Sequence, residues 1–283
     1  MIPFFIIILI LCLLVYLYLM CLKPNTVRRG QMKPFEEVYI AHRGLFDNNS
    51  PAPENSMAAF QRAVDGGYGI ELDVHLSADR KLVVFHDDTL KRMCGIDRAV
   101  ADCTSQELQQ YTLGKSQETI PLLTDVLKIV DGKVPMIIEV KPAPNCTEVS
   151  AALAKMMQSY KGLYCMESFH PAAVAWFRHN APEVIRGQLA TDFTHGGVHK
   201  PYLRNILLAN LLFNGYAKPD FIAYDHKFPN QFSYKLCRKL FDVEHVAWTI
   251  RSEKQLTTAR EYFQVFIFDS FIPKDKNPGK NQS

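Results

Sequence analysis

Eight short runs of β-branched and aromatic residues, separated by longer amphipathic stretches, recur between residues 38 and 269. Strands that alternate with helices in this way form parallel sheets, and eight such units predict an α/β fold of the closed (β/α)8 or TIM-barrel type. The expected strands are Val38–Ala41, Ile70–His75, Met136–Val140, Tyr164–Ser168, Ile185–Ala190, Phe221–Asp225, His245–Thr249 and Val265–Asp269. The expected helices are Ser56–Gly66, Leu122–Val130, Val149–Tyr160, Ala172–Asn180, Gln231–Phe241 and Ser252–Tyr262.

A further β-rich run, Lys81–His86, follows the second strand after only Ser77-Ala78-Asp79-Arg80. Because this connection is too short for a parallel crossover, we expect a hairpin arm that folds back over the barrel mouth. The arm would return His86 toward the level of Glu71. Residues 90–115 are polar and weakly periodic, and we expect them to form a small insertion after the second strand.

The second strand carries two carboxylates on one face. Side chains alternate along a strand, so Glu71, Asp73 and His75 share one side. Two buried carboxylates repel each other and are costly to desolvate unless a cation neutralises them. The pattern therefore predicts a metal site, while His75 lies further out, either at a solvated rim or in the site itself.

The other expected strand ends supply the groups that complete such a site, because catalytic side chains of these barrels lie at the carboxyl ends of the strands. With Glu139, the two carboxylates give an oxygen-only ligand set that suits Ca²⁺ or Mg²⁺. Cationic side chains suit a phosphate, and histidines suit acid–base work near neutral pH. These groups are Arg43, Lys141, His42 and His86. The combination indicates cleavage of a phosphoester.

The order of these motifs resembles the glycerophosphodiester phosphodiesterase family, in a membrane-anchored member of the bacterial type. The matching motifs are His42-Arg43-Gly44, Pro53-Glu54-Asn55-Ser56, Glu71-Leu72-Asp73-Val74, Val83-Val84-Phe85-His86-Asp87-Asp88-Thr89-Leu90, Ile120-Pro121, Glu139-Val140-Lys141-Pro142, Ser168-Phe169 and Trp248-Thr249. The resemblance runs from about Tyr39 to about Pro273 and implies a barrel of the phospholipase-C-like phosphodiesterase type.

The resemblance also implies a role for each matching residue. Three carboxylates would bind the divalent metal, two histidines would form the acid–base pair, two cations would hold the phosphate, and two aromatic residues would line the alcohol pocket. The carboxylates are Glu71, Asp73 and Glu139, and the histidines are His42 and His86. The cations are Arg43 and Lys141, and the aromatic residues are Phe169 and Trp248. Glu54 would be either a ligand or a group behind the ligands, and we expect Asp87 and Asp88 to be turn and supporting groups.

Similar enzymes release glycerol 3-phosphate, and the sequence leaves two routes open. Either the glycerol 2-hydroxyl attacks phosphorus and water opens the cyclic phosphate, or water attacks directly. Two departures from the family pattern affect the expected shape of the substrate pocket. The last strand ends in Phe268-Asp269-Ser270 rather than Thr-Asp followed by Pro, and Leu122 replaces a threonine.

Residues 1–22 contain no charged side chain and are long enough to cross a bilayer as one helix. Lys23, Arg28, Arg29 and Lys33 follow, so the positive-inside rule predicts a single-pass membrane protein with a cytoplasmic catalytic domain. Seven cysteines without a metal-binding or disulfide spacing agree with a reducing compartment. We expect a linker at 23–36, the catalytic domain at 37–273 and a disordered tail at 274–283.

The expected partners are a glycerophosphodiester or lysophospholipid substrate and the membrane, with no obligatory protein partner. A net charge of +3 does not favour nucleic acid. Competing hypotheses are a lysophospholipase D and an inactive, membrane-attached binding module. The apolar run Ile206–Phe213, flanked by Lys200, Arg204 and Lys218, is either a helix packed on the barrel or a membrane-facing element near the site entrance.

Overall fold

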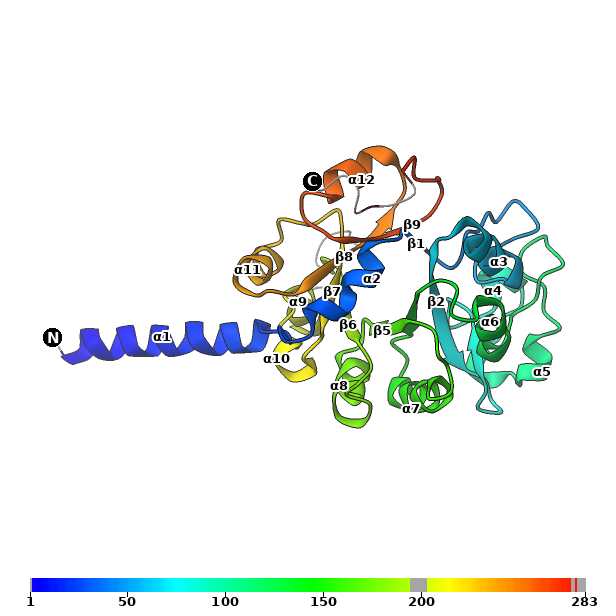
Figure 1. The fold of residues 1–283 in the computed structure, drawn as a ribbon. Coiled ribbons are helices and arrows are strands. Elements are labelled where there is room, and N and C mark those ends of the chain that lie inside the picture. Colours follow the sequence, from blue (N-terminus) through cyan, green and yellow to red (C-terminus); the bar gives the residue numbers. More distant parts are fainter. Residues whose placement is uncertain (1, 194–202, 276–277, 279–283) are drawn as a thin grey trace.

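The computed structural model of the chain describes residues 2–193, 203–275 and 278, and these form a closed barrel of parallel strands with helices outside it (Figure 1). The strand order is β1-β9-β8-β7-β6-β5-β4-β2, and β1 also pairs with β2, which closes the ring. The strands are β1 Ile40–Ala41, β2 Gly69–Leu76, β3 Leu82–Val84, β4 Met136–Val140, β5 Tyr164–Ser168, β6 Arg186–Ala190, β7 Phe221–Asp225, β8 Glu244–Ile250 and β9 Val265–Phe268. The prediction of a (β/α)8 barrel is confirmed.

Helices cover the outer face of the barrel and lie close to their expected positions. They are α3 Met57–Gly66, α6 Leu123–Val130, α7 Cys146–Met157, α8 Pro171–Asn180, α9 Leu203–Ala209, α10 Asn214–Ala217, α11 Phe232–Leu240 and α12 Glu253–Ala259. Helix α3 shows why the ends are well defined: the Ser56 hydroxyl accepts a hydrogen bond from the Ala59 backbone, and Gly67 ends the helix with a φ of 72°. Alternating strand residues such as Leu72 and Val74 pack against these helices.

The hairpin arm and the insertion are present where the sequence predicts them. Strand β3 pairs antiparallel with β2, with His75 opposite Val83. The insertion that follows contains α4 Lys91–Cys94, the 3₁₀ helix η2 Val100–Asp102 and α5 Ser105–Leu108. Its buried side chains, among them Leu90, Val100 and Leu108, form a small core of their own beneath the arm.

The segment before β1 is packed against the barrel, which differs from the linker that we expected at residues 23–36. A 3₁₀ helix, η1 Arg29–Met32, and α2 Lys33–Glu36 carry Met32 and Phe35 into the core that fills the inside of the barrel. The charges of the segment, which favoured a linker, pair with buried acids instead: Arg28 Nη1 lies 3.2 Å from Asp220 Oδ2. Met32 and Phe35 are three positions apart, so on a helix they lie on the same side and form an apolar face. This spacing in the sequence was a signal that the segment packs against the barrel.

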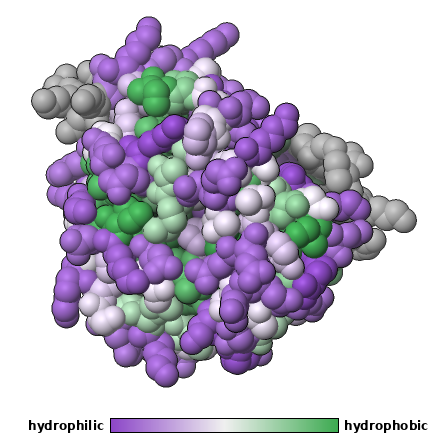
Figure 2. All heavy atoms as spheres, turned by 90° about the vertical axis from the view of Figure 1, so that its right-hand side faces the viewer, coloured by the Kyte–Doolittle hydropathy of each residue, from purple (hydrophilic) through white to green (hydrophobic). Residues whose placement is uncertain are grey.

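Helix α1, Ile2–Leu22, extends away from the barrel on the side of α9, α10 and α11 (Figure 1). Its segment Phe4–Leu22 has a mean hydropathy of 3.1 and is long and apolar enough to cross a membrane. The opposite face of the molecule is largely hydrophilic (Figure 2). All seven cysteines fall within the described residues and are free thiols. The expected tail at 274–283 lies mostly outside those residues.

Candidate active site

Three carboxylates from neighbouring strands meet inside the mouth of the barrel. Glu71 and Asp73 point inward from β2, and Glu139 lies directly opposite Asp73 on β4. One oxygen of each side chain lies within 4.8 Å of one oxygen of the others, and all three side chains are buried. The parity of β2 and its register with β4 therefore create an acidic cluster, whose members the sequence indicated through strand parity and strand ends.

Burial and neighbouring acids disfavour the ionised forms of two of these carboxyl groups. Burial, together with Asp73 and Glu139, raises the pKa of Glu71 well above its ordinary value. The pKa of Glu139 rises to about 7 because of its burial, despite the nearby Lys141. Three close oxygens with such mutual repulsion fit a hard divalent cation, which would remove the cost of ionising them.

Cationic groups surround the same carboxylates. Lys141 Nζ lies 3.1 Å from Asp73 Oδ1 and 3.0 Å from Glu139 Oε1. Burial raises the pKa of Asp73, but Lys141 and Arg43 outweigh it and hold that pKa below its ordinary value. Asn55 Nδ2 also donates to Asp73 Oδ2 over 2.8 Å. Asp73 is thus fixed in its ionised form from three directions.

The turn after β1 aims its backbone at the cluster. Arg43 and Gly44 have φ values of 55° and 79°, and a Cβ atom on Gly44 would lie 2.9 Å from the Ala59 backbone, so this position requires glycine. The turn lets the Arg43 backbone N–H donate to Glu71 Oε2 over 2.9 Å. The motif His42-Arg43-Gly44 thereby supplies a histidine to the site and fixes the carboxylate of Glu71 through a backbone hydrogen bond.

Two histidines flank the cluster, and each is held at Nδ1 by a carboxylate. His42 Nδ1 lies 2.9 Å from Asp269 Oδ2, and His86 Nδ1 lies 2.6 Å from Asp87 Oδ1. The Nδ1 atoms are therefore engaged, and on the opposite side of the ring His42 Nε2 is 3.9 Å from Glu71 Oε2. Burial lowers the pKa of both imidazoles, which favours their neutral form at neutral pH.

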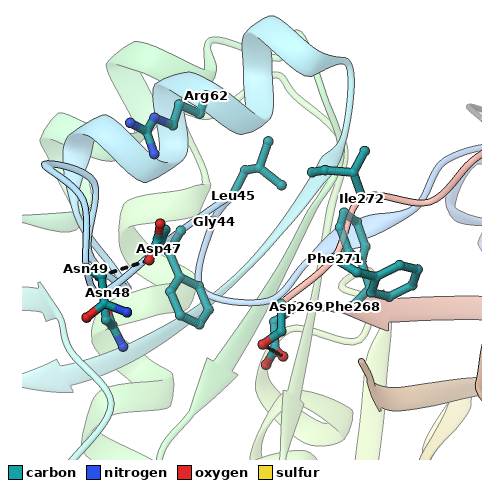
Figure 3. A pocket seen from close by; sticks show the side chains of 12 residues that line it. Gly44, Leu45, Asp47, Asn48, Asn49, Arg62, Phe268, Asp269, Phe271 and Ile272 are labelled. Carbon is teal, nitrogen blue, oxygen red and sulfur yellow. Dashed lines mark hydrogen bonds between the residues drawn. The ribbon is translucent and has the colours of Figure 1, made fainter. Parts of the chain in front are cut away.

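Asp269 was not among the residues that we expected in the site. Figure 3 shows it at the end of β9, between the loop that carries Gly44 and Asp47 and the chain that carries Phe271. Burial raises its pKa, but the hydrogen bond with His42 helps to lower that pKa to about 2. In the sequence, Asp269 stood out only because Phe268-Asp269-Ser270 departs from the family pattern. Its place at the end of the last strand, which neighbours the first strand in a closed barrel, was a signal for its contact with His42.

Glu54 is held by two arginines and an asparagine. Its Oε1 lies 2.7 Å from Arg43 Nη1 and 2.6 Å from Arg92 Nη2, and Asn48 donates to Oε2 over 3.0 Å. Burial raises the pKa of Glu54, but these partners lower it to about 2. Arg92 also bonds Asp87 over 2.6 Å, so one arginine of the insertion links Glu54 to the support of His86.

Aromatic side chains form one wall of a narrow cleft above the carboxylates. The rings of Phe169 and Trp248 meet edge to face, with centroids 5.4 Å apart. The cleft has a volume of about 120 Å³, and its lining includes both histidines, Arg43, Glu71 and Glu139. Phe169 and Trp248 thus line the same cleft as the two histidines and two of the three clustered carboxylates.

Two buried residues differ from expectation. His75 is 6% exposed, and its Nε2 lies 3.4 Å from the backbone oxygen of His86, so it is a buried support of the arm rather than a solvated rim residue. Glu167 was overlooked: it lies opposite Glu139 on β5, lines the cleft, and has a pKa raised well above its ordinary value by burial and by Glu139. Its inward parity beside Glu139 was a signal available in the sequence.

Comparison with known proteins agrees with this geometry. The model of the glycerophosphoryl diester phosphodiesterase family matches residues 42–216. The chain belongs to this family. A glycerophosphodiester phosphodiesterase of Bacillus altitudinis is 31% identical over 181 residues, which are 59% of this chain and 71% of that protein. A lysophospholipase D of Homo sapiens is 34% identical over 146 residues, which are 47% of this chain and 45% of the human protein.

A solved structure of similar fold covers more of the family barrel. A phosphodiesterase of Oleispira antarctica, in complex with the product sn-glycerol-3-phosphate, superposes with a TM-score of 0.67. It is 23% identical and covers 82% of this chain and 92% of its own, which shows a shared fold. Curated relatives are spanned less fully: the match covers 71% of the Bacillus altitudinis protein and 45% of the human protein.

Proposed function

We propose that this family member hydrolyses glycerophosphodiesters to glycerol 3-phosphate and an alcohol, with Ca²⁺ or Mg²⁺ as cofactor. The observation that carries the proposal is the buried cluster of Glu71, Asp73 and Glu139, which lies in the barrel mouth with two histidines around the adjoining cleft. A hard cation can withdraw charge from a phosphoryl group, and imidazoles can transfer protons near neutral pH.

The three clustered carboxylates would hold the cation, which when bound would withdraw charge from a phosphoryl oxygen. Arg43 and Lys141 would hold the phosphate, since both cations already lie against the cluster. Glu54 would act behind the ligands, because its two oxygens are occupied by Arg43, Arg92 and Asn48.

His42 and His86 would be the base and the acid. Both are held at Nδ1, by Asp269 and Asp87. The neutral imidazole would accept a proton from the nucleophile at Nε2, and the other, protonated at Nε2, would give its proton to the leaving alcohol. Both remaining routes, through a cyclic phosphate or through direct attack by water, use one base and one acid. Phe169 and Trp248 would line the alcohol pocket.

The apolar helix α1 would anchor the enzyme in a membrane as a single-pass protein, with the barrel in the cytoplasm. The basic residues that follow the helix support this orientation. No obligatory protein partner or nucleic acid is needed for the proposed reaction. An inactive binding module is the weaker alternative, because it would have no need of two histidines around a cleft that adjoins a cluster of three carboxylates.

Product analysis tests this function. The full chain in detergent micelles should convert glycerophosphocholine to glycerol 3-phosphate and choline, both measured by enzyme-coupled assay. Release of glycerol and phosphocholine instead would place cleavage on the other side of phosphorus and would contradict the proposal. A lysophospholipase D, the second candidate, is favoured by an apolar hollow beside the cleft.

A further inference from the structure

A second hollow adjoins the catalytic cleft, and Phe169 lines both. It has a volume of about 760 Å³, which is within the usual range for a small-molecule pocket. Its walls come from the segments after β4, β5 and β6 and from the region of α9 and α10. The side chains that the argument uses are Phe169, Phe193, Arg204, Leu208, Phe213 and Tyr216.

The hollow is predominantly apolar. Phe169 and Phe193 meet edge to face with centroids 5.9 Å apart, and Leu208 and Phe213 face the same space from the chain of α9 and the residues before α10. Arg204 is the one lysine, arginine, aspartate or glutamate among the lining residues of the described chain. Such a lining favours a hydrocarbon group rather than a polar head group.

The same region of the barrel holds the end of α1. Asn214 Nδ2 donates to the Leu22 backbone oxygen over 3.1 Å, and Lys218 Nζ donates to the Lys23 oxygen over 2.9 Å. Gly215 lies so close to the α1 backbone that a side chain there would collide with Met20. Helix α10, which contributes Tyr216 to the hollow, is therefore in direct contact with the apolar helix.

Exposed apolar side chains occur on α10 and on the neighbouring α9 and α11. Tyr216, Leu203 and Phe232 are 56%, 70% and 72% exposed, on α10, α9 and α11 respectively. These are the elements beside which α1 leaves the barrel (Figure 1). If α1 spans a bilayer, this side of the barrel faces the bilayer surface, and the hollow lies between that surface and the catalytic cleft.

We propose that the hollow binds the acyl chain of a lysophospholipid taken from the membrane in which α1 is embedded. The proposal rests on the proposed phosphodiesterase function and defines its substrate. Water would supply the oxygen that bonds to phosphorus, the bond from phosphorus to the head-group alcohol would break, and that alcohol would receive a proton. The products are a lysophosphatidic acid and the free alcohol.

Dependence on acyl-chain length tests the pocket. The full chain, kept soluble in amphipol, is assayed with monomeric lysophosphatidylcholines of increasing chain length and with glycerophosphocholine. Each buried methylene should raise kcat/KM roughly fourfold until the hollow is filled. A kcat/KM that does not change with chain length would overturn the proposal, while hydrolysis of glycerophosphocholine would still support the proposed function.

A substitution in the wall separates the pocket from the chemistry. Leu208→Asp should lower kcat/KM for the longest substrate by about tenfold or more and leave glycerophosphocholine hydrolysis within about twofold. Leu203→Asp, on the same helix but outside the lining, is the matched control and should change neither. Equal losses on both substrates in Leu208→Asp would show a general defect and would contradict the assignment.

Photolabelling tests the pocket without turnover. A lysophosphatidylcholine with a terminal diazirine, added to the full chain in nanodiscs, should label Leu208 or Phe213, and an excess of unlabelled long-chain lysophosphatidylcholine should prevent it. Labels confined to α1 would overturn the proposal. If neither substrate is hydrolysed but the hollow is labelled, the proposed function fails and the binding site stands.

Discussion

At the residue scale, the candidate site depends on carboxylates that hold other groups as much as on the expected ligands. Asp269 and Asp87 engage the two histidines, and Glu54 joins Arg43 to Arg92. The sequence predicted the histidines and the three clustered carboxylates because strand parity and strand ends determine their direction. It did not predict Asp269, because its partner lies 227 positions away and only closure of the barrel brings them together.

Removal of the support of His42 should slow the chemical step. Asp269→Asn should lower kcat by on the order of 10²-fold with little change in KM, because the imidazole loses the group that fixes its tautomer. His42→Ala should cost about two to four orders of magnitude. Steady-state kinetics with glycerophosphocholine provide the measurement, and Asp242→Asn, at an exposed side chain, is the control. A kcat for Asp269→Asn close to that of the unmodified chain would remove Asp269 from the account.

The ionisation of Glu54 should make the free energy of unfolding depend on pH in the acid range. Its pKa is about 2 in the folded chain against an ordinary 4.5, so its contribution is complete above pH 4.5 and is lost as the pH falls through about 2. The contribution is on the order of 3 kcal/mol, since one pKa unit corresponds to about 1.4 kcal/mol. Glu54→Gln should therefore lower Tm at neutral pH and approach the unmodified chain at low pH.

Thermal unfolding in detergent across this pH range checks the sign. Glu148→Gln, at an exposed ion pair with Arg80, is the control and should leave Tm almost unchanged. A difference between Glu54→Gln and the unmodified chain that grows as the pH falls would contradict the assigned pKa.

At the scale of elements, hydrophobic periodicity predicted the strands and most helix positions, while packing across long sequence distances was not predictable. The hairpin arm followed from a connection too short for a crossover, and β3 indeed pairs antiparallel with β2. Prolines and charges at residues 23–36 indicated a linker, but Met32 and Phe35 fill the inside of the barrel. The composition of a short segment does not show whether its few apolar side chains pack against strands that are distant in the sequence.

The packing of this segment predicts a large effect at one position. Phe35→Ala should destabilise the barrel by about 3–5 kcal/mol, because it leaves a cavity among buried strand residues. Val27→Ala, at a side chain that is 88% exposed, should change stability by about 0.5 kcal/mol or less. Chemical denaturation measures both free energies of unfolding. Equal values for the two variants would mean that the segment behaves as a linker.

At the scale of the whole molecule, α1, the apolar exposed residues of α9 to α11 and the hydrophilic opposite face define two unlike sides. Figure 2 shows that the side remote from α1 is largely hydrophilic. The cleft and the proposed acyl-chain hollow share Phe169, so the fold places an apolar hollow beside the polar cleft. The sequence indicated the anchor and an apolar run, but not that α10 joins them.

The orientation of the anchor is open to direct measurement. A reporter fused after Ser283 should be active only in the cytoplasm, because the basic residues follow α1. Arg28 and Arg29 form ion pairs with Asp220 and Glu244, so charge reversal at either would also disturb the fold. Lys23→Gln changes the charge beside α1 without breaking these two ion pairs and is the variant to compare. An external signal from the reporter would contradict the proposed topology.

We propose that Glu71, Asp73 and Glu139 hold a divalent cation that phosphodiester hydrolysis by this chain requires. The most direct measurement is glycerol 3-phosphate release from glycerophosphocholine by the full chain, after chelation and during titration with Mg²⁺ or Ca²⁺. Chelation should abolish release, added cation should restore it, and Glu71→Ala should lower it by at least about 10²-fold at any cation concentration. Release that survives chelation, or that survives Glu71→Ala, would contradict the account.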